Sequence, residues 1–477
     1  TSGAGNTAVG YNSGKLITSG ANNTILGHGA MDATPVAATG NVAIGTNSMG
    51  GAASAQSASN YNVSIGFESM AAVLNGAGEN VAVGAYALTA LTSGDENVAI
   101  GLNAGDSFTT QNRNVVIGHN VAQASIAGSI VAIGYKALED CQADGTVGIG
   151  IEAAKNITTG SGNVAVGYSA LSQHTTGARN IAIGYGAMDG TGQDDSPTST
   201  DNIFIGYDAG GGAWDDGADG TDDSNFNVGI GNYVMDAAMD GAMAASLKNT
   251  AVGHESGTAI TTGSQNALLG FQAGGAIQGG AWNTCLGDRA GDSISSGGAN
   301  VAIGTTSDCA ATANNQIAIG NGTVTDAANR GRWGNSSVSQ NNIQTDWTVD
   351  SDVRIKKDIE NSNIGLLFVN ALKTRKYKKR HPSEYDAEIL EARYKKGGFN
   401  YDDDKDEIIK DEFDDNKVWN GLVAQEVKTV MDDLDVEFSG WSEDSNGKQG
   451  IQYSTLVVPL IKAVQELSAK VEALEKK

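Results

Sequence analysis

The chain has 477 residues, a net charge of −25 at pH 7, 65 Gly, 4 Pro and 3 Cys. Phosphate binding requires a basic face, so this acidic composition argues against a nucleic-acid partner, and the lack of any run of 18 apolar residues argues against membrane insertion. The cysteines, Cys141, Cys285 and Cys309, are too few and too widely spaced for a disulfide framework or a metal site, and we expect neither a metal nor a cofactor.

The composition changes near residue 345, which divides the chain into a body and a tail. Residues 1–345 hold 58 of the 65 Gly and have a net charge of −18, from 9 Lys and Arg against 27 Asp and Glu. Residues 346–477 hold the other 21 Lys and Arg and have a net charge of −7. Because the chain begins with Thr1 inside a repeat, we expect it to be a fragment.

A five-residue pattern recurs through residues 1–320: Asn, a β-branched or small residue, a small residue, then Ile, Val or Leu, and Gly. Residues 163–167, with the sequence NVAVG, are one instance. Most repeats are 16–18 residues long, with exceptions of 21, 22, 25 and 22, and this short period predicts a solenoid of stacked β coils, since so short a unit cannot hold two helices. Eighteen repeats follow one another, and their closing glycines are at positions 10, 27, 45, 66, 84, 101, 118, 134, 150, 167, 184, 206, 231, 253, 270, 287, 304 and 320.

Each coil is expected to contain a four-residue strand, a turn at Gly and a second short strand, such as residues 168–171. With Asn as position one, alternation places positions two and four, mostly Val, Ile, Leu or Thr, on one face of the strand. Position three, mostly Ala, Gly or Ser, lies on the other face. These small residues permit a close approach either across a thin coil or at a subunit axis, and the pattern leaves both open.

Asn opens 15 of the 18 strands. In stacked coils a repeated Asn can form a ladder of amide hydrogen bonds, or it can simply tolerate the turn conformation. The closing Gly is expected to have a positive φ at a tight corner.

The repeats resemble the head repeats of trimeric bacterial adhesins of the YadA type, over roughly residues 1–320. The resemblance implies a homotrimer in which each chain forms a left-handed parallel β-roll. Related repeats also occur in phage fibres, so the resemblance implies an architecture and leaves the biological setting open.

Longer repeats within residues 184–253 carry acidic inserts that include Asp215, Asp216, Asp219 and Asp222. Carboxylates are suitable ligands for Ca²⁺, but their spacing does not match an EF-hand loop. We therefore favour solvated loops, with a calcium site or a receptor-binding protrusion as the alternatives.

Residues 321–350 lose the repeat and are expected to form a cap and connector. Three sequence blocks follow, SDVRIKKDI at 351–359, GLVAQEV at 421–427 and YSTLVVPLIKAVQEL at 453–467. In this order they resemble the intramolecular chaperone auto-processing domain of the endosialidase type, which follows the stalks of phage tail spikes and fibres. For residues 351–477 we therefore expect a smaller α+β domain.

In that family the domain helps three chains to fold together and then cuts itself off before a serine, with a lysine five residues later as the base. The resemblance implies that Ser351 is the nucleophile, Lys356 the general base and Asp350–Ser351 the scissile bond. A lysine accepts a proton only where desolvation or a nearby cation lowers its pKa, and Arg354 and Lys357 are candidate cations. Since an exposed lysine would not serve, we expect Lys356 to be buried, at a subunit contact. The alternative is a turn serine beside a solvated lysine.

The last segment predicts a helix whose apolar residues follow a heptad spacing, at Leu460, Val464, Leu467, Val471 and Leu474. Two to three heptads are marginal in isolation. Attached to a trimeric body, they are expected to form a coiled coil that aligns three chains.

We thus expect a mainly β homotrimer with a β-roll or β-solenoid body at 1–320, a connector at 321–350 and a chaperone at 351–477. The leading functional hypothesis is a phage tail fibre or spike, part of the virion, that binds a glycan or protein receptor on the host cell. The alternative is a trimeric adhesin head on a bacterial cell surface, without proteolysis. A glycan-degrading spike ranks lower, because no carboxylate pair stands out among the many Asp residues.

Overall fold

The chain divides into two compact units, residues 1–323 and 324–477. The structure, a computed structural model, describes residues 3–33, 37–51, 58–190, 199–212, 224–237, 247–335, 338, 352–380, 417–443 and 447–476. It also includes the backbone of two two-residue strands, at 214–215 and 239–240.

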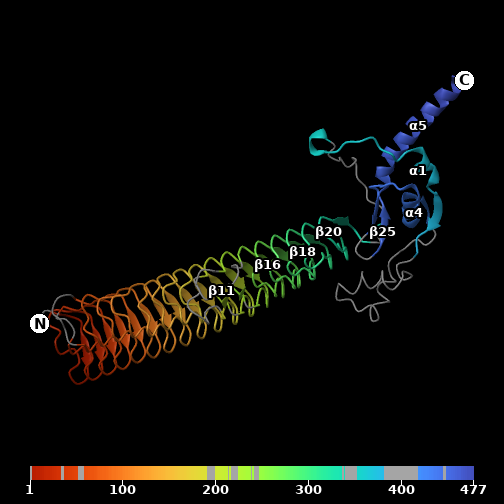
Figure 1. The fold of residues 1–477 in the computed structure, drawn as a ribbon. Coiled ribbons are helices and arrows are strands. Elements are labelled where there is room, and N and C mark those ends of the chain that lie inside the picture. The colour runs from red at the N-terminus through yellow and green to blue at the C-terminus, as the bar shows by residue number, and fades with distance from the viewer. Residues whose placement is uncertain are drawn as a thin grey trace. The chain divides into compact units, whose positions relative to one another are not determined.

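The first unit is a parallel β-solenoid of stacked coils (Figure 1). Each of the eighteen repeats contributes one three-residue strand that ends one residue before its closing glycine. Consecutive strands pair in parallel and in register, and this confirms the solenoid that the repeat predicts. The strands are β1 (Thr7–Val9), β2 (Thr24–Leu26), β3 (Val42–Ile44), β4 (Val63–Ile65), β5 (Val81–Val83), β6 (Val98–Ile100), β7 (Val115–Ile117), β8 (Val131–Ile133), β9 (Val147–Ile149), β10 (Val164–Val166), β11 (Ile181–Ile183), β12 (Ile203–Ile205), β14 (Val228–Ile230), β16 (Thr250–Val252), β17 (Ala267–Leu269), β18 (Thr284–Leu286), β19 (Val301–Ile303) and β20 (Ile317–Ile319).

The second strand predicted in each coil is wrong. Residues 168–171 form turns, and Ser169 and Leu171 have φ angles of 52° and 55°. Left-handed residues recur at the second and fourth positions after the closing glycine in many coils, for example at Tyr86 and Leu88. Because each left-handed residue redirects the chain, this segment bends around the core instead of extending as a strand.

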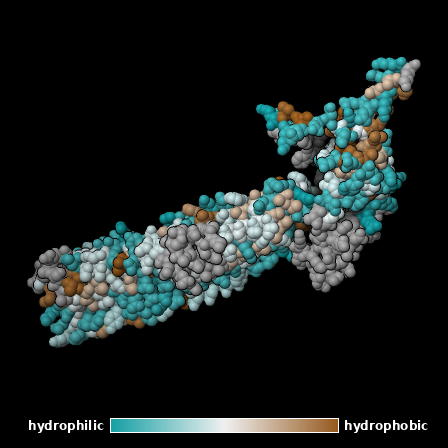
Figure 2. Space-filling model, in the orientation of Figure 1, coloured by the Kyte–Doolittle hydropathy of each residue, from teal (hydrophilic) through white to brown (hydrophobic). Residues whose placement is uncertain are grey.

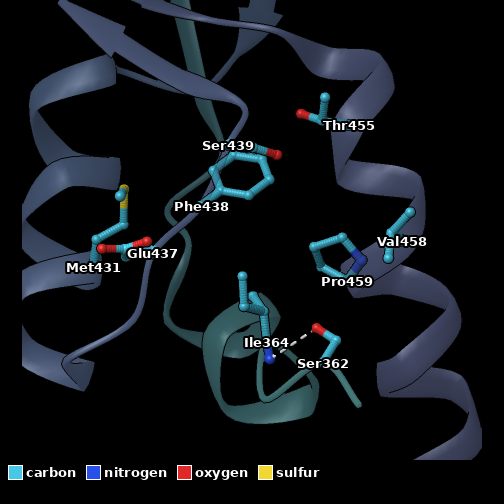
Figure 3. Close-up of a pocket in the computed structure, with 9 residues that line it drawn as sticks. All are labelled: Ser362, Ile364, Met431, Glu437, Phe438, Ser439, Thr455, Val458 and Pro459. Atoms are coloured by element: carbon cyan, nitrogen blue, oxygen red, sulfur yellow. Dashed lines mark hydrogen bonds between the residues drawn. The ribbon is translucent and has the colours of Figure 1, made fainter. Parts of the chain in front are cut away.

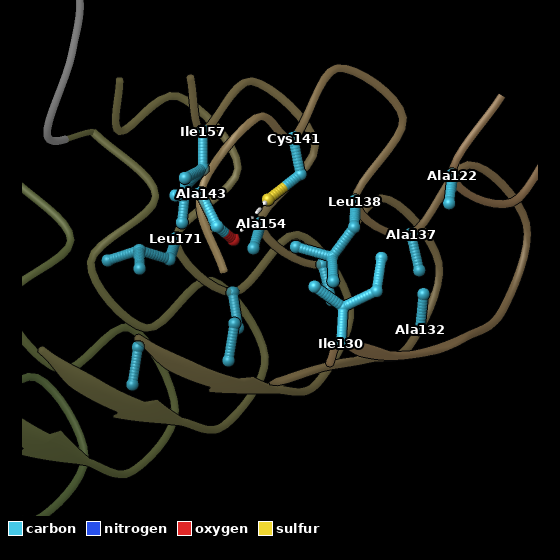
Figure 4. Close-up of a cluster of buried hydrophobic side chains, with 14 of the residues drawn as sticks. Ala122, Ile130, Ala132, Ala137, Leu138, Cys141, Ala143, Ala154, Ile157 and Leu171 are labelled. Atoms are coloured by element: carbon cyan, nitrogen blue, oxygen red, sulfur yellow. Dashed lines mark hydrogen bonds between the residues drawn. The ribbon is translucent and has the colours of Figure 1, made fainter. Parts of the chain in front are cut away.

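Small strand residues face the inside of the coil, and larger residues from the turn segment pack against them. Ala132 and Ala165, at position three of their strands, are fully buried, as is Leu138 from a turn segment. The small residues therefore serve the close approach across a thin coil. Figure 4 shows part of this core, with Ala122, Ile130, Ala132, Ala137, Leu138, Cys141, Ala143, Ala154, Ile157 and Leu171 labelled.

Side-chain size is compensated between neighbouring coils. Phe204 occupies position three of β12 and is fully buried. The facing residue in β14 is Gly229, where an added Cβ would lie 2.6 Å from the Phe204 ring. The extra volume in one coil is thus accommodated by the missing side chain in the next.

A ladder of asparagines runs through the buried corner of the solenoid. The backbone N–H and side-chain Nδ2 of Asn97 both donate to Oδ1 of Asn80, at 3.0 and 2.9 Å. Asn97 Nδ2 also donates to the Gln111 carbonyl at 2.8 Å. Each amide thereby satisfies buried backbone groups of adjacent coils, so the repeated Asn forms a ladder and does more than tolerate a turn.

The closing glycines have positive φ, as expected. Gly101 has a φ of 135°, and a Cβ added there would lie 2.0 Å from the Gly118 carbonyl oxygen of the next coil. The corner therefore requires glycine for two reasons, its backbone conformation and the close approach of the adjacent coil.

The second unit holds short helices and antiparallel strand pairs. Strand β22 pairs with β23, and β24 pairs with β25. Phe368, Val427, Val430, Met431 and Phe438 form its core. No helix in the described part of the chain is long and apolar enough to span a membrane. The elements are β21 (Gly331–Trp333), the 3-10 helix η1 (Val353–Ile355), α1 (Leu366–Ala371), β22 (Arg375–Lys378), β23 (Val418–Gly421), α4 (Ala424–Leu434), β24 (Trp441–Glu443), β25 (Gln449–Ile451), the 3-10 helix η4 (Tyr453–Leu456) and α5 (Val457–Glu475).

Candidate functional site

The expected cleavage site directly precedes η1 in the sequence. Asp350 and Ser351 fall outside the described residues. Lys356 follows η1 directly, and its backbone N–H donates to the Val353 carbonyl at 3.2 Å. Its side chain is exposed. Within a single chain, the desolvation that a lysine base requires is therefore not supplied.

The neighbouring charges at this site are partly compensated. Asp352 accepts a hydrogen bond from the Arg354 backbone N–H at 2.8 Å, which caps η1. The Arg354 Nε donates to the same carboxylate at 3.0 Å, and these bonds lower the pKa of Asp352. Of the two cations expected to act on Lys356, Arg354 is therefore already compensated by a carboxylate.

The acidic inserts give no metal site in the part that the structure describes. Asp215 lies in strand β13 (Trp214–Asp215), which pairs in parallel with β15 (Met239–Asp240). Asp216, Asp219 and Asp222 lie outside the described residues. Among the residues that are described, no group of three or more His, Cys, Asp or Glu is placed to hold a metal ion.

Two apolar surfaces stand out, and the first is on the solenoid. We call positions two and four of the solenoid strands the outer row. In most strands these residues are only half-buried, while position three between them is buried. Because the strands pair in register, the outer row continues from coil to coil. Six of its members are 38–58% exposed: Val9, Leu26, Ile100, Ile230, Leu269 and Leu286.

The second apolar surface is on helix α5. Its heptad residues do not pack into the core of the second unit, although the predicted helix itself is confirmed. They are 44–69% exposed, and they are Leu460, Val464, Leu467, Val471 and Leu474. The surface drawn in Figure 2 is otherwise largely hydrophilic along the solenoid, with separate apolar patches.

A cavity of about 450 Å³ opens in the second unit between α4, α5 and the segment before α1 (Figure 3). Its polar groups are the hydroxyls of Ser362, Ser439 and Thr455 and the carboxylate of Glu437. The Ser362 hydroxyl accepts from the Ile364 backbone N–H at 3.2 Å. The lining residues include no imidazole, amine or thiol. Apolar residues complete the lining: Ile364, Met431, Phe438, Val458 and Pro459.

Sequence reasoning did not identify a row of stacked aromatic side chains on the solenoid. We call the run Tyr168, Tyr185, Tyr207, Tyr233, His254 and Phe271 the aromatic ladder. The signal was present in the repeat, because most of these residues directly follow a closing glycine.

A second overlooked feature is the buried carboxyl of Asp308. It is 2% exposed, and its Oδ1 accepts from the Cys309 and Ser293 backbone N–H groups at 2.8 and 3.2 Å. Burial, together with the nearby Asp292, raises the pKa of Asp308 to about 7. Because the bond from Ser293 joins Asp308 to the adjacent coil, we assign the carboxyl a structural role.

The chain was compared with known proteins. No protein-family model matches it, and no curated protein matches it. A functional assignment therefore rests on the residues and surfaces described above.

Proposed function

We propose that the protein is the homotrimeric fibre or spike of a phage tail, with a host-binding solenoid body and a C-terminal chaperone domain that removes itself. The observation that carries this proposal is the outer row, an apolar surface that repeats in every coil along the solenoid. A surface of this length, left in water, favours association.

The occupant that we propose for the outer row is another copy of the same chain. A copy carries the same residues with the same coil spacing, so the residues at position four, which are Val, Ile or Leu in every coil, can meet aliphatic residues along the contact. Burial of the row would contribute about 25 cal/mol for each Å² of apolar surface removed from water. A partner of different periodicity would fall out of register after a few coils.

Helix α5 also supports an assembly of three copies of the chain. Its exposed heptad residues suit a short three-helix coiled coil formed by three copies. Such a bundle is marginal by itself but gains from the tethering of the three chains through their bodies. In this proposal the smaller α+β domain aligns the chains before the slow inter-chain β contacts form.

The proposed processing is one round of serine proteolysis. Lys356 in its neutral form accepts the Ser351 hydroxyl proton while Ser351 Oγ attacks the Asp350 carbonyl carbon. The peptide C–N bond breaks, the proton passes to the Ser351 amino group, and an ester joins Asp350 to Ser351 Oγ. Water hydrolyses the ester and leaves a free Asp350 carboxylate and a free Ser351 amine.

Trimer assembly would supply what the single chain lacks. Lys356 is exposed in one chain, and a neighbouring copy would have to desolvate it before it could act as a base. Cleavage would then follow correct assembly. After the chaperone domain is released, the solenoid body could no longer refold with its help. A high barrier to unfolding would then keep the body folded.

Denaturing gel electrophoresis and mass spectrometry test the processing. The wild type should give fragments of 350 and 127 residues, while Ser351→Ala and Lys356→Ala should each give one full-length band. Lys470→Ala, an exposed lysine on α5, is the matched control and should be cut like the wild type. An uncut wild type in assembled trimers would reject self-cleavage and favour the adhesin alternative.

A further inference from the structure

The aromatic ladder spans six consecutive coils. Its ring centroids are 4.8, 5.2, 5.3, 5.8 and 5.5 Å apart in chain order, so the rings form one continuous line along the solenoid. The four rings of Tyr168, Tyr185, Tyr207 and Phe271 are 44–52% exposed. Rings that only stabilised the stacking of coils could lie inside the core, and these do not.

The relative orientation of neighbouring rings in the ladder changes at Tyr233. Tyr168, Tyr185 and Tyr207 stack with interplanar angles of 10°. The Tyr233 ring stands at 63° to Tyr207 and at 69° to His254. In these T-shaped contacts the edge of one ring meets the face of its neighbour, so the run is not a uniform face-to-face stack here.

The coils that carry the ladder also carry the acidic inserts. The three longer repeats fall between Gly184 and Gly253, inside the span from Tyr168 to Phe271. The inserts of two neighbouring coils pair with each other through β13 and β15. Two departures from the regular repeat thus coincide at one position along the solenoid, which distinguishes these coils from the others.

The charge around the aromatic ladder limits which classes of ligand could bind there. Residues 163–275 contain only two Lys and Arg, namely Arg179 and Lys248. Arg179 is paired with Asp201, with Nε and Oδ1 2.6 Å apart. The carboxylate of Asp208 lies close to Tyr207. A nucleic acid or a sulfated glycan would be repelled here, whereas carboxylates and tyrosine hydroxyls are good acceptors for neutral hydroxyl groups.

We propose that the aromatic ladder is a binding site for an uncharged, unbranched oligosaccharide that lies along the solenoid axis. Tyrosine combines an apolar ring with a polar tip, so the half-exposed rings can offer their apolar edges to the C–H groups of a sugar and their phenol oxygens to its hydroxyls. A straight row of rings favours a linear chain of sugars over a branched one. This inference rests on the proposed host-attachment function and names the chemistry of its receptor.

Isothermal titration calorimetry on the full-length protein tests the site, with maltoheptaose, cellohexaose and chitohexaose as probes and heparin as the charged comparison. The wild type should bind at least one neutral probe. Tyr185→Ala and Tyr207→Ala should each weaken that binding at least tenfold. Tyr135→Ala is the matched control, because Tyr135 occupies the same position in its coil, is 41% exposed and lies outside the ladder.

Four results would overturn the inference. The first is that no neutral probe binds, and the second is that heparin binds more tightly than the neutral probes. The third is that Tyr135→Ala loses as much affinity as the ladder variants. The fourth is that the trimer dissociates in the ladder variants, which would assign the ladder to a contact between copies. Sedimentation and gel analysis of the same samples separate this inference from the proposed function. A processed trimer that binds no oligosaccharide rejects the ladder site alone, whereas an unprocessed protomer rejects the proposed function.

Discussion

Single amide groups hold adjacent coils together. Asn97 Oδ1 accepts from Asn114 backbone N and Nδ2, at 3.1 and 2.9 Å, and its own amide donates to the preceding coil. Asn97→Ala leaves these buried groups unpaired and should lower the free energy of unfolding by about 2–4 kcal/mol. Denaturant titration measures the change. Asn112→Ala removes an exposed amide whose partner water can replace, and equal losses in both variants would contradict the ladder's role.

The Asp308 carboxyl should make stability depend on pH. Its pKa is about 7 in the folded chain and near 4 when unfolded, so the folded state binds more protons between these values. Stability should therefore fall as pH rises from about 4 to 7. Asp308→Asn keeps the Oδ1 acceptor and removes the charge. It should raise the thermal midpoint at pH 8 and leave it nearly unchanged at pH 4. A constant difference across this range would show that the carboxyl does not titrate as described.

At the scale of the coil, the closing glycine sets the corner. Gly101→Ala combines an unfavourable φ of 135° with a Cβ 2.0 Å from the Gly118 carbonyl oxygen, so neighbouring coils must separate. Gly145 also has a positive φ, 72°, but an added Cβ there meets nothing within 4 Å. Gly145→Ala should cost about 1 kcal/mol, and Gly101→Ala considerably more, as thermal unfolding followed by circular dichroism would show. Equal effects would mean that backbone conformation alone selects glycine.

The repeat made the element order of the solenoid predictable, because its glycines mark where every strand ends. The turn segment was not predictable in the same way. Leu171 and Ser169 have no glycine-like signature, and their left-handed conformations arise from the need to close a thin coil around small strand residues. The burial of position three also depends on that closure, which alternation alone cannot decide.

The sequence predicts the expected processing site only as a short motif, without the environment of its side chains. Spacing places Lys356 five residues after Ser351, but a short motif does not determine whether a side chain is desolvated, and in the structure Lys356 is exposed. The aromatic ladder shows the same limit. Residues 17–26 positions apart become neighbours only once the coils stack.

At the scale of the whole molecule, one charge in the outer row should affect assembly more than folding. Ile183→Asp replaces a half-buried residue of β11, which a single chain tolerates but a trimer contact does not, because the contact would bury an unpaired carboxylate. The variant should sediment as smaller species with an unchanged circular dichroism spectrum. Thr159→Asp, at an exposed turn, should remain assembled, and a fully assembled Ile183→Asp protein would place the contact elsewhere.

In the proposed assembly, copies of this chain cover each other's outer rows. Sedimentation equilibrium of the purified wild-type protein, over a wide concentration range, tests this arrangement. We predict a single species with three times the mass of one chain, or of its 350-residue fragment, that persists on dilution. A stable, soluble single chain at all concentrations would contradict the account.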